Sequence, residues 1–400
     1  MPDLTPLIVF ADDWGRHPSS CQHLVSHLLP QRRVVWVNTI GTRPPRLNWS
    51  TVTRAVEKLK QWVRPQPNDS PPPQTGEGLS PCILNPKMWP SFRSRFGRGL
   101  NRRLLTRVLR PIAETMPRPP IVVTTLPLVP DLVGAFPAAR WVYYCVDDFG
   151  VWPGLDGRVL SGMEAELVAK VDTVVAVSKV LQAHIAGLGK SAHLLTHGVD
   201  LKHFRQIPTH SPAWVEGLSE LPTPLVVFWG VIDRRMDLGF VRRLGERMTE
   251  GTILLVGPQD DPDLELFRLP RVRASPPVPY ADLPVLAARA SVLVMPYADL
   301  PVTRAMQPLK LKEYLATQKP VVVRKLPATE PWADCLDMAD TPDEFATAVL
   351  ARLRTGLPAT QVGARSRLEA EGWHAKAEEF ERWIDGDEQQ VITTPEESPR

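Results

Sequence analysis

Lys310 and Glu313 are the side chains whose spacing points most directly to a chemistry. They follow an apolar run at 291–296 and a polar loop, and Pro308 suits a first helical position because it has no N–H to leave unpaired. Residues three apart share one helix face. A helix N-terminus at the carboxyl edge of a parallel sheet binds anions, a lysine adds a cation for phosphate oxygens, and a glutamate accepts hydrogen bonds from ribose hydroxyls. The segment therefore predicts a site for a nucleotide-activated substrate, and the residues expected there are Gln307, Pro308, Leu309, Lys310 and Glu313.

Two further loops follow apolar runs in the second half of the chain. Gly230 ends the run 224–229 and permits a close backbone turn, and Arg234 and Arg235 come shortly after it. We expect at least one of these arginines to contact a diphosphate, because the carboxyl ends of parallel strands share one edge of a sheet. The alternative is a pair of solvated arginines at a helix start. Gly257 ends another run and is expected to approach the nucleotide, although plain turn chemistry also explains a glycine there.

Asp147 and Asp148 are the catalytic candidates in the first half. They follow the apolar run 140–146, so they should face the same cleft. A carboxylate there could bind a substrate hydroxyl or stabilise positive charge in a substrate. The alternative is that the pair caps the next helix. On that helix, Glu164 and Glu166 are expected to form a solvated face.

The composition limits the class of protein. Four hundred residues suit two domains, and 43% hydrophobic with 23% charged residues is typical of globular chains. A net charge of +3 gives no overall signature of nucleic-acid binding. The four cysteines are far apart, which favours buried free thiols over disulfides or a zinc site. His23 and His27 have helical spacing but no third ligand nearby, so a helix face is expected there and no metal.

The pattern of apolar runs predicts two α/β units. Short apolar runs alternate with amphipathic stretches in both halves, which is typical of parallel sheets buried on both faces. A proline-rich linker at 204–224 separates the halves. We predict Rossmann-like, doubly wound domains over 1–205, on the acceptor side, and 222–358, which binds the nucleotide sugar, followed by helices over 359–385 and a disordered tail over 386–400.

At this point the chain resembles a known family. The segment PLKLKEYLATQKPVV, at 308–322, resembles the donor-site segment of retaining glycosyltransferases with the GT-B fold, the family 4-like or group 1 enzymes. The resemblance covers roughly residues 5–385 and implies two Rossmann-like domains that face each other across a cleft. Two positions depart from the family pattern. Ala305 stands where many members carry a second glutamate that contacts the donor sugar, and Gln318 replaces the usual glycine.

The resemblance also implies roles for residues in several loops. The loop after the first strand approaches donor and acceptor, which implicates Gly15, Arg16 and His17. The stretch around Pro279 and Tyr280 corresponds to the segment that holds the nucleobase. The segment THGVDLKHF resembles the family's end of the first domain, so Gly198 is expected to line the cleft or to serve as a hinge. The last helix is expected to cross back to the first domain.

These residues together predict a glycosyltransferase of the hexosyltransferase type. It would move a sugar from a UDP- or GDP-linked donor to a polysaccharide, lipid-linked or other acceptor, with retention of configuration. Arg234 or Arg235 and Lys310 would stabilise the leaving diphosphate, so neither a metal nor a cofactor is expected. The alternatives are a GT-B-fold sugar-nucleotide epimerase and a non-catalytic relative that binds the nucleotide sugar.

The location and the surface of the chain give two last expectations. The N-terminus lacks a basic region followed by a long apolar run, and no stretch has the length of a membrane span, so we expect a cytoplasmic protein. The stretch 91–110 holds seven arginines and no acid, with Phe96, Leu100, Leu104 and Val108 at helical spacing. Such a helix either contacts anionic lipid at the inner face of the membrane or packs its stripe on its own sheet.

Overall fold

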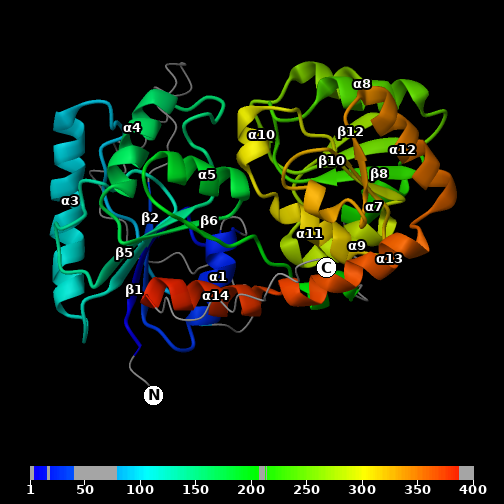
Figure 1. Ribbon diagram of the computed structural model, residues 1–400. Coiled ribbons are helices and arrows are strands. Elements are labelled where there is room, and N and C mark those ends of the chain that lie inside the picture. The colour runs from blue at the N-terminus through cyan, green and yellow to red at the C-terminus, as the bar shows by residue number, and fades with distance from the viewer. Residues whose placement is uncertain (1–3, 16–18, 40–78, 207–211, 213, 387–400) are drawn as a thin grey trace, which may run out of the picture.

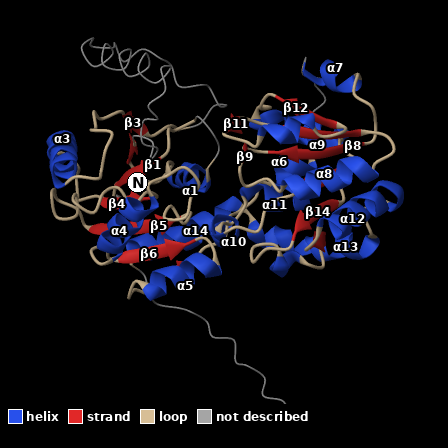
Figure 2. Cartoon of the chain, turned by 90° about the horizontal axis from the view of Figure 1, so that it is seen from above, coloured by secondary structure: helices blue, strands red, loops and turns tan. Residues whose placement is uncertain are grey.

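Two parallel β-sheets lie side by side in this computed structural model, which describes residues 4–15, 19–39, 79–206, 212 and 214–386 (Figure 1). Each sheet carries helices on its faces, and the view from above separates the same two halves (Figure 2). Arg16, His17 and residues 387–400 of the predicted tail lie outside the described residues.

The first sheet has seven described strands in the order β3-β2-β1-β4-β5-β6-β7, and every pairing in it is parallel. Its central strands are apolar and fully buried because helices cover both faces. The strands are β1 (Leu7–Ala11), β2 (Val34–Asn38), β3 (Cys82–Leu84), β4 (Ile121–Thr124), β5 (Arg140–Cys145), β6 (Thr173–Ala176) and β7 (His193–Leu194).

The second sheet has six described strands in the order β12-β10-β8-β13-β14-β15, again parallel throughout. A small sheet of β9 (Ile232–Asp233) and β11 (Gln259–Asp260) lies beyond the ends of β8 and β10. The six strands are β8 (Leu225–Trp229), β10 (Thr252–Val256), β12 (Val272–Ser275), β13 (Val292–Met295), β14 (Val321–Arg324) and β15 (Asp337–Ala339). Strands β8, β10, β13 and β14 form where the apolar runs of the second half predict strands.

The helices connect these strands, and many begin at a residue whose side chain caps the first turn, such as Ser94, Asp156, Ser178 and Thr341. The first half holds α1 (Ser20–Leu28), α3 (Arg95–Glu114), α4 (Gly157–Val168), α5 (Lys179–Gly187) and α6 (Leu201–Arg205). The remaining helices are α7 (Trp214–Ser219), α8 (Leu238–Arg247), α9 (Leu283–Arg289), α10 (Pro301–Ala305), α11 (Leu309–Ala316), α12 (Pro342–Thr355), α13 (Ala359–Ala364) and α14 (Trp373–Asp385).

The chain returns to the first half through α14. This helix packs against α1, and Phe380 and Ile384 are fully buried in the core of the first half. The buried Arg32 guanidinium donates to Glu381 Oε1 at 2.8 Å and also binds Asp385. An isolated β-bridge between Val199 and Gly372 joins the two segments of the chain that cross between the halves. No helix among the described residues has the length and apolar character that crossing a membrane requires.

Several sequence-based expectations were wrong. Cys82 is exposed because β3 is an edge strand, whereas Cys21, Cys145 and Cys335 are buried thiols as expected. The apolar stripe of α3 does not face the sheet. Its buried residues are Gly97, Asn101, Leu105, Leu109 and Ala113, and Phe96 is 77% exposed. Helix α7 and strands β7, β12 and β15 were not predicted, because these elements are short or partly polar.

Glu164 does not lie on a solvated face. Its carboxylate is buried, accepts a hydrogen bond from the Tyr143 hydroxyl at 2.6 Å, and pairs with His184 Nε2 at 2.8 Å. The hydrogen bond to Glu164 raises the pKa of His184 although partial burial opposes it. Glu166 instead lies at the surface, where it binds Arg98. A buried carboxylate thus joins β5, α4 and α5 beneath the end of β5.

Removing the Tyr143 hydroxyl tests this buried cluster. Tyr143→Phe should lower the free energy of unfolding by about 1–3 kcal/mol, because Glu164 loses a donor while it stays buried. Tyr144→Phe is the matched control, since the Tyr144 hydroxyl on the same strand is buried and makes no hydrogen bond of good geometry among the described residues. Urea unfolding followed by circular dichroism measures both variants. Equal losses for the two would mean that the Tyr143 to Glu164 bond contributes nothing.

Candidate functional site

A cavity of about 380 Å³ lies where the carboxyl ends of the two sheets face each other. Residues directly after β1, β4 and β5 line it from one side, and residues after β8, β10 and β13 line it from the other. The first half contributes Ala11, Asp12, Ser19, Ser20, Cys21, Thr125, Val146, Asp147, Trp152 and His197. The second half contributes, among others, Trp229, Gly230, Arg235, Gly257, Tyr280, Tyr297, Gln307, Pro308, Leu309, Lys310 and Glu313.

Lys310 lies over a glycine turn at the centre of this cavity. Gly230 has a φ of +137°, and a Cβ added there would lie 2.3 Å from Lys310 Nζ. Gly257 has a φ of +147°, and its Cβ would lie 2.0 Å from the Gly230 carbonyl oxygen. Only glycine permits these turns and this closeness. The backbone, the ammonium group and the start of α11 thus form a cradle in which an anion fits.

The Lys310 ammonium has aromatic neighbours rather than acidic ones. Nζ donates to the Tyr297 hydroxyl at 2.6 Å and lies 5.0 Å from the centre of the Phe228 ring. No ion pair involves Lys310 among the described residues. Lys312, two residues later, is different: its buried ammonium binds Glu371, Thr196 and the His197 carbonyl, and thereby joins α11 to the crossing segments.

Glu313 lies one turn into α11 and also lines the cavity. Its Oε2 accepts a hydrogen bond from Trp229 Nε1 at 3.2 Å. Burial raises the pKa of its carboxyl group, whereas the Trp229 hydrogen bond and the Lys310 charge oppose that rise. Pro308 is the residue before the first helical one, so α11 begins one position later than predicted. Glu313 and Lys310 therefore share the face of α11 that meets the cavity.

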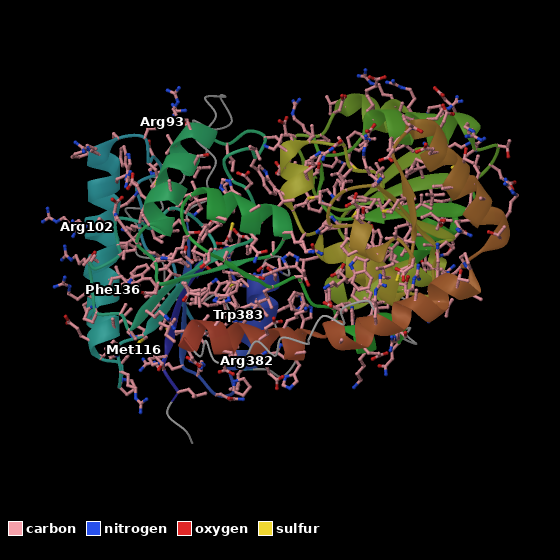
Figure 3. The ribbon with its side chains drawn as sticks, viewed as in Figure 1. Arg93, Arg102, Met116, Phe136, Arg382 and Trp383 are labelled. Atoms are coloured by element: carbon pink, nitrogen blue, oxygen red, sulfur yellow. The ribbon has the colours of Figure 1, made fainter. Side chains whose placement is uncertain are left out.

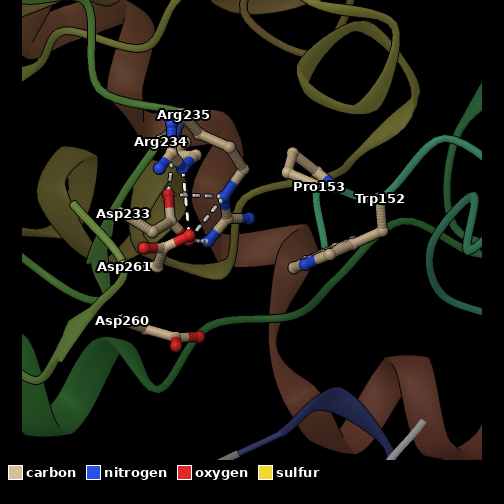
Figure 4. Close-up of a pocket in the computed structure, with 7 residues that line it drawn as sticks. All are labelled: Trp152, Pro153, Asp233, Arg234, Arg235, Asp260 and Asp261. Atoms are coloured by element: carbon tan, nitrogen blue, oxygen red, sulfur yellow. Dashed lines mark hydrogen bonds and ion pairs between the residues drawn. The ribbon is translucent and has the colours of Figure 1, made fainter. Parts of the chain in front are cut away.

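Arg234 and Arg235 have different surroundings. Arg235 is buried, pairs with Asp233 at 2.7 Å, and lines the large cavity. Its guanidinium also lies 4.7 Å from the Trp152 ring, which comes from the other half of the molecule. The side chain of Arg234 is 62% exposed, binds Asp261 at 3.0 Å, and lines only the small neighbouring pocket (Figure 4). Of the two arginines, Arg235 is the one that the large cavity includes.

Asp147 and Asp148 also separate. Asp147 lines the cavity, and burial raises the pKa of its carboxyl group to about 7 although the Arg235 charge opposes this. Asp148 is turned to its own loop, where Oδ1 accepts a hydrogen bond from the Gly150 N–H at 3.0 Å. Neither residue caps the next helix, because Asp156 does so. A carboxyl group that titrates near neutral pH therefore faces the cradle from across the cleft.

The remaining predicted residues are placed as follows. Tyr280 lines the cavity and stacks on His203 with a centroid distance of 4.5 Å. Gly15, Gly198 and Pro279 are not among the residues that line it. Gly198 instead packs against Trp373, where an added Cβ would lie 2.7 Å from the indole ring. A hinge at Gly198 stays a prediction.

Sequence reasoning missed several lining residues. Asp12 lies directly after β1, and His197 precedes Gly198; burial and the Lys312 charge lower the pKa of His197 to about 3, so its ring is neutral. Trp229 and Tyr297 end or follow predicted strands, so the rule that strand ends face the cleft could have found both. Trp152 lies beyond the end of β5, and no pattern marks it. No group of His, Cys, Asp and Glu side chains within the described ranges has the geometry of a metal site.

Comparisons with known proteins agree on the architecture. No family model matches the sequence. A protein of Bacillus subtilis (strain 168), provisionally named as the teichuronic acid biosynthesis glycosyltransferase TuaH, is 27% identical over 184 residues. That match covers 43% of this chain and 45% of the relative, so the chain matches less than half of the relative's length.

Solved structures match nearly the whole chain. Sucrose-phosphate synthase from Thermosynechococcus elongatus has a TM-score of 0.68 at 16% identity, covering 96% of this chain and 98% of its own. Anabaena Alr3699/HepE in complex with UDP-glucose has a TM-score of 0.66 at 12% identity, covering 96% and 100%. Trehalose-6-phosphate synthase OtsA has a TM-score of 0.64 at 12% identity, covering 96% and 99%. This chain has the GT-B fold. The predicted fold class is confirmed, and the matched sequence segment is similar to a glycosyltransferase.

An experiment can distinguish two roles of Glu313: binding ribose hydroxyls, and holding Trp229 through a hydrogen bond. We expect Glu313→Ala to weaken binding of a nucleoside diphosphate by about 1–3 kcal/mol, as for a lost hydrogen bond to a charged group. The wild type should also bind the 2′,3′-dideoxy form of the nucleotide more weakly than the ribose form, and Glu313→Ala should remove that difference. Titration calorimetry with UDP, GDP and their dideoxy forms measures both effects.

A control variant tests whether the effect of Glu313→Ala is specific to the cavity. Glu330→Ala changes an exposed glutamate of the same half and should leave both affinities unchanged. If Glu313→Ala weakens the ribose and dideoxy forms equally, Glu313 acts through the Trp229 contact and not on the sugar.

Proposed function

We propose that the chain is a glycosyltransferase of the hexosyltransferase type, which moves a sugar from a nucleotide-diphosphate sugar to an acceptor with retention of configuration. The observation that carries the proposal is the meeting of Lys310, the turns at Gly230 and Gly257, and Glu313 in one interdomain cavity. These groups match the two ends of a nucleoside diphosphate, because the cradle suits phosphate oxygens and Glu313 suits ribose hydroxyls. The donor is linked to UDP or GDP.

The chemistry begins with departure of the diphosphate. As the bond from the anomeric carbon to the phosphate oxygen breaks, negative charge grows on that oxygen. Lys310, the first N–H groups of α11 and Arg235 stabilise this charge at fixed positions. The acceptor hydroxyl then attacks from the face that the diphosphate leaves, and a phosphate oxygen takes its proton. Positive side chains and the helix dipole do this work, so the proposed mechanism calls on no metal.

The acceptor side belongs to the first half of the molecule. Asp147 and Asp12 line the cavity opposite the cradle, and their carboxylates suit sugar hydroxyls or positive charge at the anomeric carbon. The acceptor in this proposal is a cell-surface polysaccharide or a lipid-linked sugar. TuaH is named as an enzyme of teichuronic acid biosynthesis, and this similarity supports a polymer of that chemical kind. We place the chain in the cytoplasm, at the inner face of the membrane.

One observation favours a second candidate, a relative that binds nucleotide sugar without transfer. Ala305, at the end of α10, brings no carboxylate to the cavity. Its side chain is buried against the core of the first half, and its carbonyl accepts a hydrogen bond from Ser178 Oγ at 2.5 Å. The sugar-binding glutamate that the resemblance leads one to expect is therefore replaced by an interdomain contact. Transfer assays with cellular acceptor fractions distinguish the two candidates.

Lys310 should act on turnover more than on donor binding. Charge develops on the leaving oxygen only as the bond breaks, so Lys310→Met should lower turnover by roughly 10²–10³ with a smaller change in donor affinity. Methionine keeps most of the aliphatic stem over the Phe228 ring. Release of nucleoside diphosphate and transfer of radiolabelled sugar measure turnover, and calorimetry measures affinity.

The control is Lys325→Met, at a half-exposed lysine outside the cavity, which should leave turnover intact. If Lys310→Met raises the donor Michaelis constant while turnover stays intact, Lys310 is a ground-state binder and the proposed mechanism is wrong at this residue. Donor binding by the wild type without transfer to any acceptor fraction would favour the non-catalytic candidate.

Asp147 should set the pH dependence of turnover. Its raised pKa of about 7 means that the carboxyl group is protonated below neutral pH and charged above it. If the carboxylate is the active form, wild-type turnover rises with pH through about 7. Asp147→Asn should lower turnover and remove this rise, whereas Asp148→Asn should keep it. A pH profile of Asp147→Asn with the same rise as the wild type would assign the titration to another group.

A further inference from the structure

Helix α3 carries an unusual combination of exposed side chains. Phe96 is 77% exposed, the largest exposure among the large hydrophobic side chains of the described residues. Leu100, Arg103 and Arg107 follow at helical spacing on the same outward face, while Gly97, Leu105 and Leu109 form the opposite, buried face. A large aromatic ring thus lies in a row with arginines and away from the sheet.

The outward-facing arginines of α3 form no ion pair with a described acidic residue. Arg102, Arg103 and Arg107 are exposed and take part in no ion pair within the described part of the chain. By contrast, Arg98 is bound by Asp131 and Glu166, and Arg93 is bound by Asp156 at 2.5 Å. The helix contains no acid before Glu114. Positive charge therefore gathers on α3 although the whole chain has a net charge of only +3.

The segment before the helix packs on the other face of α3. Trp89 is 41% exposed, and its ring lies close to Gly97 in the first turn of α3. The buried Asn101 fixes this segment, because its side chain accepts from the Trp89 N–H at 2.6 Å and donates to the Trp89 carbonyl at 3.0 Å. These hydrogen bonds tie the preceding segment to α3, whose first turn carries Phe96.

The position of α3 leaves the cavity open. It lies on the outer side of the first half, away from the second sheet, in both views (Figures 1 and 2). The labelled Arg93 and Arg102 side chains reach outward from this side of the molecule (Figure 3). A flat partner on this face would cover neither the cleft nor the second half.

We propose that the face of α3 formed by Phe96, Leu100, Arg103 and Arg107, together with the flanking Arg102, docks on the anionic surface of a lipid bilayer. Arginines attract anionic head groups, and aromatic rings enter the boundary between head groups and acyl chains. A soluble polyanion would need the arginines but gives no reason to expose Phe96. The combination of charge and an exposed aromatic ring therefore favours a bilayer. This inference does not depend on the proposed transferase activity.

Vesicle sedimentation with the full chain tests the proposal. The vesicles are phosphatidylcholine alone and an equal mixture of phosphatidylcholine with phosphatidylglycerol. We expect binding to the anionic vesicles, weakened by salt because the charges are exposed, and no binding to the neutral ones. The variant Arg102→Gln, Arg103→Gln, Arg107→Gln should bind about 100-fold more weakly, about fivefold for each arginine. Phe96→Ser should bind about tenfold more weakly, because an apolar ring no longer enters the boundary.

Matched variants control for charge and for exposure. Arg268→Gln, Arg289→Gln, Arg354→Gln removes the same charge from exposed positions of the second half, and Leu264→Ser removes an apolar side chain that is 67% exposed. Both should bind anionic vesicles like the wild type. Unchanged melting temperatures verify that the variants fold.

Three results would overturn the proposal. The first is equal recovery on both kinds of vesicle, or none on either. The second is an equal loss in the α3 variant and in its charge-matched control, which would mean that net charge alone drives binding. The third is full vesicle binding by Phe96→Ser together with equally strong capture by heparin, which would assign α3 to a soluble polyanion.

Discussion

The site depends on one ammonium group that forms no ion pair with any described residue. Lys310 Nζ has a tyrosine hydroxyl and two aromatic rings as neighbours, and it lies against the Gly230 turn, where an added Cβ would clash with it. A partly buried cation normally has an ionic partner, because leaving water costs free energy that an opposite charge offsets. An anionic ligand would supply that partner. Gly230 makes room for the Lys310 side chain, Gly257 allows a close approach to the Gly230 carbonyl, and residues at the carboxyl ends of both sheets line the cavity around them.

Lys312 shows what a structural lysine in the same helix looks like. Its ammonium is almost fully buried, and burial lowers its pKa to about 8 even though Glu371 opposes that change. Glu371 also binds Lys376, so the start of the returning helix α14 is held to α11 of the second half. Together with the bridge between Val199 and Gly372, this contact fixes the crossing segments. Polar contacts at Lys312 and apolar ones such as the burial of Ala305 in the core of the first half therefore both join the two halves.

Much of the fold was readable from the sequence, because buried parallel strands leave continuous apolar runs. The runs that became β1, β8, β10 and β13 also gave the position of the site, since loops after such strands share one edge. Lys310, Glu313, Gly230 and Gly257 line the cavity as that rule predicts, and Tyr280 lines it as the family resemblance implies. What the sequence could not give was side-chain direction. Asp147 and Asp148 are adjacent, yet one faces the cavity and the other binds its own loop.

The direction of a side chain and the residues it contacts explain the other differences between prediction and structure. Arg234 and Arg235 are equivalent in sequence, but Asp233 and Trp152 hold only Arg235 in the cleft, and Trp152 comes from a distant segment. Glu164 was assigned to a solvated face because nothing local reveals that Tyr143 and His184 converge on it. The sequence left open whether the stripe of α3 faces its own sheet, because two arcs of apolar residues fit the helical period and only packing against the sheet decides between them.

The most direct test of this account is a crystal structure with a nucleoside diphosphate bound. The account predicts the diphosphate in the cavity between the halves, with a β-phosphate oxygen within hydrogen-bond distance of Lys310 Nζ and the phosphates against the Gly230 turn. It also predicts that the ribose hydroxyls reach Glu313. A diphosphate bound elsewhere, or one bound in the cavity while Lys310 keeps only its Tyr297 contact, would contradict it.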